Sequence, residues 1–109
     1  MATTTIRQGD FPMTLVNVFS VEPSNQEKLV QLLNNAAEKT MRQQPGFVSA
    51  NIHKSLDGTR VVKYAQWATK GDFEASLRSP EARAHMRAVD AIAKAERHLY
   101  VVCAVHVAT

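Results

Sequence analysis

Apolar and β-branched residues gather in four runs of strand length along the chain. Residues 13–21 (MTLVNVFSV) form the first run, which predicts a strand. Residues 47–55 (FVSANIHKS) and 59–67 (TRVVKYAQW) flank Asp57-Gly58, a pair typical of a tight hairpin turn. Residues 98–107 (HLYVVCAVHV) have the length and composition of a buried strand. The pattern therefore predicts four strands, of which the second and third form a hairpin.

Helical spacing of apolar residues separates these strands. Ser24 precedes Glu27 by three positions, a capping-box pattern, and the apolar positions that follow predict a helix to about Gln44. After the third strand, a short helix that carries Phe73 is followed by a longer one that opens at Ser79, before a proline. The predicted order of elements is β-α-β-β-α-α-β.

This order is that of a ferredoxin-like α+β fold with a four-stranded antiparallel or mixed sheet. We expect residues 13–109 to form this single domain, with residues 1–12 as a flexible lead-in. We also expect the first and third strands to lie side by side and parallel at the centre of the sheet.

Apolar side chains occur on both faces of the predicted sheet, but the two main helices can cover only one face. The uncovered face, roughly 400 Å² in area, is of the size that usually marks an interaction site. A homodimer that buries this face is therefore predicted. One set of faces carries Val16, Val18, Val48, Ala50, Ile52, Val62 and Tyr64, and the other carries Leu15, Phe19, Phe47, Val61 and Trp67.

Composition and charge narrow the classes of function. The chain has 109 residues, 45% of them apolar and 21% charged, as in ordinary globular domains. The net charge of +3 comes from scattered residues and only 6% are aromatic, so nucleic-acid binding is not expected. No segment has the length of a membrane span or the pattern of a signal peptide. The single Cys103 is expected to be a buried, inert thiol, and the cytoplasm is the expected location.

Three residues of the central strands are candidates for chemistry. Asn17 and Lys63 each lie about four residues from the start of their strands, and they share their alternation phase with Trp67. If this face lies under the helices, an apolar pocket with a few polar groups results, which is typical of a small-molecule site. The further residues expected to line it are Phe19, Ala65, Phe73, His85 and Met86.

Each of these residues also has a structural interpretation. Trp67 fits a core anchor, His85 fits a structural histidine, and Lys63 fits a strand lysine whose ammonium group reaches past the sheet edge. An amide such as Asn17 in the middle of a central strand needs a buried partner or a functional reason. No metal-ligand spacing, nucleophile-base pair, phosphate loop or dinucleotide motif occurs, so neither a metal nor an organic cofactor is expected.

Three segments resemble the antibiotic biosynthesis monooxygenase domain family over residues 13–107: LVNVF with Asn17, QQPGFVSA, and DGTRVVKYAQW ending in Trp67. The resemblance implies a homodimer that forms a dimeric α+β barrel. It is nearest to the quinone-forming enzymes of aromatic polyketide biosynthesis, which oxidise anthrone-like substrates with O₂ and without metal or flavin. It implies active-site roles for Asn17 and Trp67. Two positions depart from the family pattern, since Lys63 replaces a catalytic Asn and Phe73 replaces a Tyr.

On this interpretation Lys63 stabilises the substrate enolate by charge, Asn17 holds the oxygen function or the peroxide, and Trp67 lies against the ring. Two alternatives stay open. Haem-degrading oxygenases share the fold and use an Asn like Asn17, but His85 falls one position early, and Ser76 stands where those enzymes have a Trp. A non-catalytic dimer that binds a small aromatic molecule is the other alternative.

Overall fold

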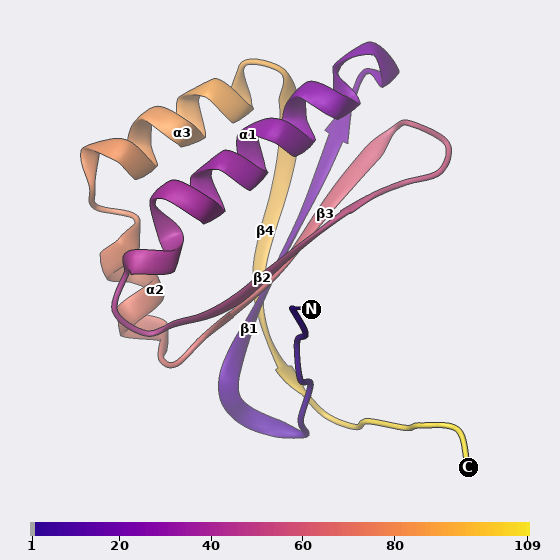
Figure 1. The fold of residues 1–109 in the computed structure, drawn as a ribbon, viewed down its shortest axis with the longest axis vertical. Coiled ribbons are helices and arrows are strands. Elements are labelled where there is room, and N and C mark those ends of the chain that lie inside the picture. The colour runs from indigo at the N-terminus through magenta and orange to yellow at the C-terminus, as the bar shows by residue number, and fades with distance from the viewer. Residues whose placement is uncertain (1) are drawn as a thin grey trace.

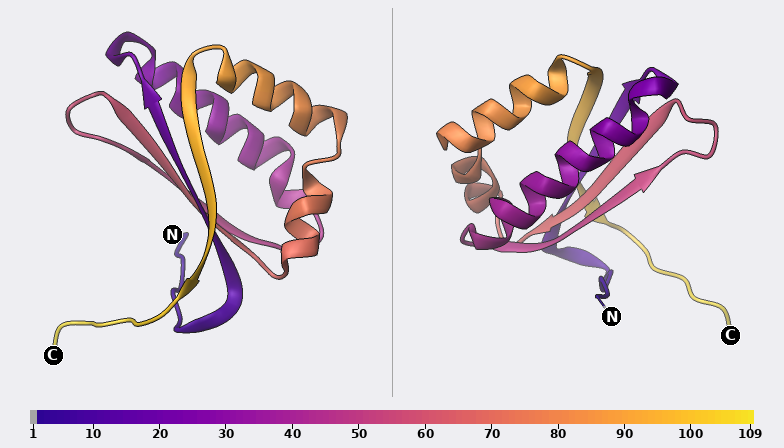
Figure 2. Two further views of the ribbon diagram at one scale, coloured as in Figure 1. Left: turned by 180° about the vertical axis from the view of Figure 1, so that it is seen from behind. Right: turned by 45° about the horizontal axis from the view of Figure 1, so that its top comes forward.

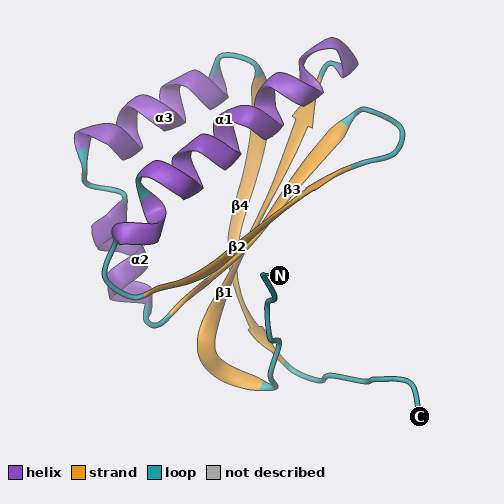
Figure 3. Ribbon diagram, in the orientation of Figure 1, coloured by secondary structure: helices purple, strands orange, loops and turns teal. Residues whose placement is uncertain are grey.

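The computed structural model describes residues 2–109, which form one antiparallel sheet with helices packed on one of its faces (Figure 1). The predicted α+β ferredoxin-like fold is confirmed, and the strand order is β2-β3-β1-β4. Figure 3 shows the helices and the strands as separate layers. The elements are β1 (Gly9–Val21), η1 (Pro23–Asn25), α1 (Gln26–Lys39), η2 (Met41–Gln43), β2 (Phe47–Lys54), β3 (Arg60–Trp67), α2 (Lys70–Ser76), α3 (Pro80–Asp90) and β4 (Ala93–Val102).

The direction of the central strands corrects one prediction. β1 and β3 are neighbours, but they run antiparallel rather than parallel. β2 and β3 form a hairpin and are therefore antiparallel. The crossover through α1 places β2 parallel to β1 but one strand away, and β3 lies between the two, antiparallel to both. Asn17 still pairs directly with Lys63, because both residues lie near the middle of their strands.

The bounds of the outer elements also differ from prediction. β1 begins at Gly9 rather than Met13, with an irregularity in its pairing to β4 between Gly9 and Thr14. β4 spans Ala93–Val102, five residues earlier than the apolar run of the sequence indicates, because an edge strand tolerates charged residues on its open side. Cys103 therefore follows the strand and is exposed, so its expected burial is wrong.

The helix termini agree only in part with their predicted signals. The Ser79 hydroxyl accepts a bond from the Ala82 amide at 3.1 Å, which confirms the cap of α3. Ser24 lies in η1 instead of capping α1, whose first turn has no side-chain cap. None of the described helices is long and apolar enough to cross a membrane.

The helices cover the face of the sheet that carries the odd-numbered residues of β1 (Figure 2). Ala50 and Ile52 also pack against this core, so the prediction that groups them with Val16 and Val18 is wrong. An irregularity between Phe47 and Ser49 changes the phase of β2, as an extra residue in a strand does. The core clusters on this face consist of Phe19, Leu29, Leu33, Val61 and Val89, and of Leu15, Ala65 and Trp67.

The other face, here called the open face, carries no helix in the part of the chain that the structure describes. The N-terminal segment crosses part of it, since the Gln66 amide donates to the Thr5 carbonyl at 2.8 Å and the Thr4 hydroxyl donates to Asn51 at 2.7 Å. Val16, Val18, Val62 and Tyr64 of this face are only half-buried.

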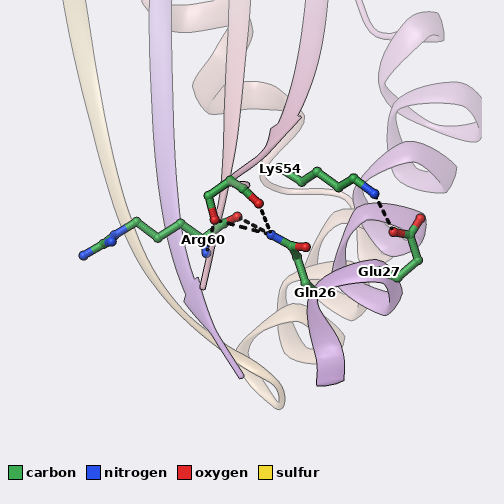
Figure 4. A network of polar contacts seen from close by, with 5 residues as sticks. Gln26, Glu27, Lys54 and Arg60 are labelled. Atoms are coloured by element: carbon green, nitrogen blue, oxygen red, sulfur yellow. Dashed lines mark hydrogen bonds and ion pairs between the residues drawn. The ribbon is translucent and has the colours of Figure 1, made fainter. Parts of the chain in front are cut away.

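The start of α1 is attached to the β2-β3 hairpin by polar contacts (Figure 4). The Gln26 side-chain amide donates to the carbonyl oxygens of Ser55 and Arg60, each at 3.0 Å. The Lys54 ammonium group forms an ion pair with Glu27 at 3.2 Å. These contacts hold one end of the helix layer, and the candidate site lies toward the other end of α1.

Candidate functional site

A cavity of about 80 Å³ lies between the sheet and the helix layer. β1, β3 and β4 form its floor with Asn17, Lys63 and Arg97, and α3 forms its roof with His85 and Met86. The remaining wall comes from the end of α1, the η2 turn and α2. This is the face and the hollow that the alternation pattern predicts.

Asn17 and Lys63 are directly paired across β1 and β3, with only 3% and 5% of their surfaces exposed. The side-chain oxygen of Asn17 is buried and has no hydrogen-bond partner among residues 2–109. Buried polar atoms normally have a partner, because an unpaired one costs about 1–3 kcal/mol. An oxygen left unpaired beside a cavity is therefore suited to accept a hydrogen bond from a ligand.

Lys63 is a buried cation without an acidic partner. Its ammonium nitrogen lies 4.0 Å from the sulfur of Met41, and neither ion pair found within residues 2–109 includes it. Burial, and next the charge of Arg97, lower the pKa of Lys63 from 10.5 to about 8. At pH 7 most molecules therefore keep a positive charge at the floor of an apolar cavity.

His85 faces the same cavity from α3 and is half-buried. Burial lowers its pKa, and the charges of Lys63 and Arg97 lower it further. Because the ordinary histidine pKa is already below 7, the ring is mainly neutral at pH 7 and can accept a proton.

Arg97 is the charged residue of the cavity floor that the sequence analysis missed. It pairs with Asn17 from the β4 side, so that Lys63, Asn17 and Arg97 form one row across three strands. Its guanidinium group contacts Asp90 at 3.3 Å, and 33% of its side chain stays exposed. The strand period could have identified it, because Arg97 occupies a cavity-facing position of a strand that begins at Ala93.

Aromatic side chains form one wall of the cavity. The Trp67 ring is only 1% exposed, and it packs edge-on against Phe47 with centroids 5.4 Å apart. Phe73 of α2 lies 6.0 Å from it on the side of the cavity. Trp67 thus anchors the core and also presents part of its surface to the cavity, so both interpretations of this residue apply.

All predicted site residues but one line the cavity. Ala65 is buried on the same face but packs in the core with Leu15 and Trp67 and does not line the cavity. Residues 2–109 contain no group of three potential metal-ligating side chains. The predicted residues that line the cavity are Asn17, Phe19, Lys63, Trp67, Phe73, His85 and Met86.

The chain is similar to known proteins over most of its length. The sequence pattern of the antibiotic biosynthesis monooxygenase family matches residues 12–88. Tetracenomycin-F1 monooxygenase of Streptomyces glaucescens is 47% identical over 72 residues, which are 66% of this chain and 64% of that protein. The matched part thus spans less than two thirds of that relative.

Two solved structures are similar over most of the chain. A monooxygenase from the gene ActVA-Orf6 of Streptomyces coelicolor, in complex with nanaomycin D, has a TM-score of 0.76 at 28% identity. The match covers 90% of this chain and 93% of that one. SnoaB, a cofactor-independent oxygenase from Streptomyces nogalater, has a TM-score of 0.72 at 27% identity, with 85% and 94% of the chains covered.

Proposed function

The chain belongs to the antibiotic biosynthesis monooxygenase family, and from this premise we propose that it oxidises an anthrone-like aromatic substrate to a quinone with O₂, without metal or flavin. The observation that carries the proposal is the buried Asn17–Lys63 pair, which has no ion-pair partner among residues 2–109 and lies beside Trp67 in a largely apolar cavity. The relatives described as a tetracenomycin-F1 monooxygenase and a cofactor-independent oxygenase support this chemistry.

The reaction needs no external reductant. The substrate methylene loses a proton to give an enolate, which transfers electrons to O₂ and forms a carbon–oxygen bond. Loss of water from the resulting peroxide leaves a carbonyl group, so that CH₂ and O₂ become C=O and H₂O. The carbon is oxidised by four electrons, and O₂ accepts the same four.

The residues of the cavity match the steps of this reaction. His85 can accept the methylene proton because burial and the neighbouring cations lower its pKa and so keep its ring in the neutral form at pH 7. The Lys63 ammonium group stabilises the enolate oxygen in a dry environment, where such a charge contributes a few kcal/mol, or about a hundredfold in rate. Asn17 holds the ring oxygen or the peroxide, and Trp67 and Phe73 position the ring.

The cavity must enlarge to admit a tricyclic substrate. Its volume of about 80 Å³ is below the roughly 300 Å³ at the lower end of small-molecule pockets. Met41 and Met86 line it, and their flexible unbranched side chains can adopt other rotamers at little cost. Side-chain movement is therefore part of substrate entry.

The test is oxygen uptake with emodin anthrone under air, together with identification of the product. We expect one O₂ consumed per substrate, incorporation of one ¹⁸O atom into the quinone, and a loss of about a hundredfold in rate for Lys63→Ala. Lys94→Ala, which removes a lysine outside the cavity on β4, should keep the wild-type rate.

Two results would contradict the proposal. Equal rates for wild type and Lys63→Ala would remove Lys63 from the reaction. Binding of the anthrone without oxygen uptake would favour a non-catalytic binding protein instead.

Haem degradation is the second candidate, because Asn17 and His85 do line the same cavity. Against it, Ser76 occupies the wall of α2 and donates its hydroxyl to the Phe73 carbonyl at 2.6 Å, so no indole is offered there. Titration with haemin distinguishes the two functions. A shifted Soret band that is lost in His85→Ala would favour haem, and an unchanged spectrum would remove this candidate.

We also propose that the open face forms a homodimer interface. Its half-buried Val16, Val18 and Val62 leave an apolar surface, and the hydroxyls of Thr14 and Tyr64 are buried without a partner in the described chain. Sedimentation should give twice the chain mass for wild type and for Leu56→Asp, and the single-chain mass for Val62→Asp. A monomeric wild type at micromolar concentration would overturn this proposal.

A further inference from the structure

Two of the residues that line the cavity, Lys63 on β3 and Arg97 on β4, are cations, and only Arg97 has an ion-pair partner among residues 2–109. Both lie close enough to His85 on α3 for their charges to lower its pKa. Among residues 2–109, Asp90 pairs with Arg97, whereas Lys63 and His85 have no ion-pair partner. Glu81 also lines the cavity but is exposed and forms no ion pair within the described range.

The two strong cations stand at different depths. Lys63 is 5% exposed at the floor, where it can contact an oxygen of the ring. The Arg97 side chain lines the cavity on the opposite side of Asn17 and is 33% exposed, so it lies in a part of the cavity that is more open to solvent. A ligand whose ring oxygen meets Lys63 therefore presents its outer substituents to Arg97.

Arg97 is prepared to bind an anion. Its contact to Asp90, 3.3 Å long and largely exposed, uses one terminal nitrogen and contributes little binding energy, but it limits where the side chain points. A guanidinium group has five N–H donors in a planar fork, so donors remain that match two oxygens of a carboxylate. Charged hydrogen bonds of this kind are stronger than neutral ones.

We propose that Arg97 binds an anionic oxygen, from a carboxylate or an ionised phenol, that the aromatic ligand carries in addition to its reacting carbon. Arg97 is then a specificity-determining residue, and the preferred substrates are acidic aromatic compounds rather than neutral ones. This proposal depends on the proposed function in one respect only, namely that the ligand in the cavity contains an aromatic ring.

Trp67 provides a direct measure of binding. It is the single tryptophan of the chain, and it lines the cavity, so a quinone bound there should quench its fluorescence. The ligands are anthraquinone-2-carboxylate and its uncharged carboxamide, compared at pH 7. A third ligand, 2-hydroxyanthraquinone, is followed across the ionisation of its hydroxyl and distinguishes a phenolate from a carboxylate.

For wild type we expect the carboxylate to bind about tenfold more tightly than the carboxamide, the difference that one charge-assisted hydrogen bond provides. Arg97→Gln should reduce this preference to within about twofold while the carboxamide binds as before. Lys94→Gln, a charge-matched control elsewhere on β4, should keep the tenfold preference. Circular dichroism of each variant excludes unfolding as the cause.

The pH dependence separates Arg97 from Lys63. Lys63 loses its charge above its pKa of about 8, whereas guanidinium groups in proteins keep their charge. The titratable and charged groups that line the cavity with Lys63 are Arg97 on β4 and His85 and Glu81 on α3, and none of them gains positive charge as the pH rises. A preference for the carboxylate that persists at pH 9.5 supports Arg97, and one that disappears assigns the anion to Lys63 and overturns the proposal.

The remaining outcomes are distinct. Equal affinity of carboxylate, phenolate and carboxamide would overturn the inference but leave an aromatic-binding cavity. No quenching by any of the ligands would overturn both the inference and the proposed function. A carboxylate preference without oxidation of any anthrone would leave the inference standing and remove the proposed activity.

Discussion

The two faces of the sheet treat their buried polar side chains in different ways. On the open face, Ser49 donates to Gln66 at 2.7 Å, Gln66 donates to Thr5, and the Asn51 amide donates to the Tyr64 carbonyl at 3.1 Å. These groups satisfy one another within residues 2–109, whereas the hydroxyls of Thr14 and Tyr64, which lack a partner there, lie on the face proposed to contact a second copy. On the helix-covered face, Asn17 and Lys63 are buried, but within residues 2–109 the Asn17 side-chain oxygen has no partner and the Lys63 ammonium group contacts only the sulfur of Met41.

This contrast separates polar groups that support the fold from polar groups kept for a ligand. A buried polar group without a partner lowers stability, so the fold alone gives no reason to keep two of them side by side. Proteins commonly accept such a cost at functional sites. Within the cavity, mutation should therefore have opposite effects on the free energy of unfolding. Removing the aromatic wall should lower it, and removing the polar pair should raise it.

The largest effect is expected when the aromatic wall of the helix-covered face is removed. Trp67→Ala deletes a 1%-exposed ring that packs on Phe47 and Phe73, and such truncations cost about 3–5 kcal/mol. Urea denaturation should show this loss, while Leu56→Ala, at a fully exposed position of the hairpin, should change stability by less than about 0.5 kcal/mol. A loss below 1 kcal/mol for Trp67→Ala would mean that this face is not a packed core.

The second effect has the opposite sign. Lys63→Met should stabilise the protein by about 3 kcal/mol at pH 7, because a lysine pKa lowered from 10.5 to about 8 corresponds to roughly this penalty on the charged form. The same variant should lose activity. Thermal unfolding of both proteins, measured together with anthrone oxidation, tests the two statements.

The pH dependence of this stabilisation follows from the direction of the shift. Between about pH 8 and 10.5 the unfolded chain holds a proton on Lys63 that the folded chain has released, so wild-type stability gains from rising pH in this window. The penalty is complete below pH 8. The advantage of Lys63→Met should therefore shrink from pH 7 to pH 10, and a constant advantage would show that packing, not charge, is its cause.

The residues of the cavity floor could be predicted from the sequence because strand alternation has a period of two. Asn17, Lys63 and Trp67 share one phase whichever way the strands run, so the wrong assumption of parallel strands did not change the face to which they belong. The pairing of Asn17 with Lys63 likewise depends only on both residues lying at mid-strand.

The features that sequence did not predict depend on tertiary context. The phase change of β2 near Phe47 leaves no distinct mark in the apolar pattern, so Ala50 and Ile52 were assigned to the wrong face. Arg97 was missed because the apolar run at 98–107 indicates a later strand than the one that pairs with β1. Pairing with β1, rather than local composition, determines where β4 begins.

A smaller effect is expected on the open face. Tyr64→Phe removes a buried hydroxyl that has no partner in the described chain, so the stability of an isolated chain should not fall. If the second copy of the proposed dimer supplies that partner, the dimer dissociation constant should rise roughly fivefold, or about 1 kcal/mol. Sedimentation over a dilution series measures it, with Leu56→Ala, at the fully exposed position of the hairpin, as the control. An unchanged constant would place the Tyr64 hydroxyl outside any contact between copies.

The smallest effect concerns the charges that join the helix layer to the sheet. The ion pair of Glu27 with Lys54 is 3.2 Å long, but both side chains are more than half exposed, at 65% and 57%. Pairs of this kind contribute about 0.5 kcal/mol or less and weaken as salt is added. Glu27→Gln should therefore lower stability by no more than this amount in urea denaturation, and the difference should vanish in 0.5 M NaCl. A loss above 1 kcal/mol that resists salt would mean that charge contacts, and not the packing around Trp67 and Phe19, hold the helices on this face of the sheet.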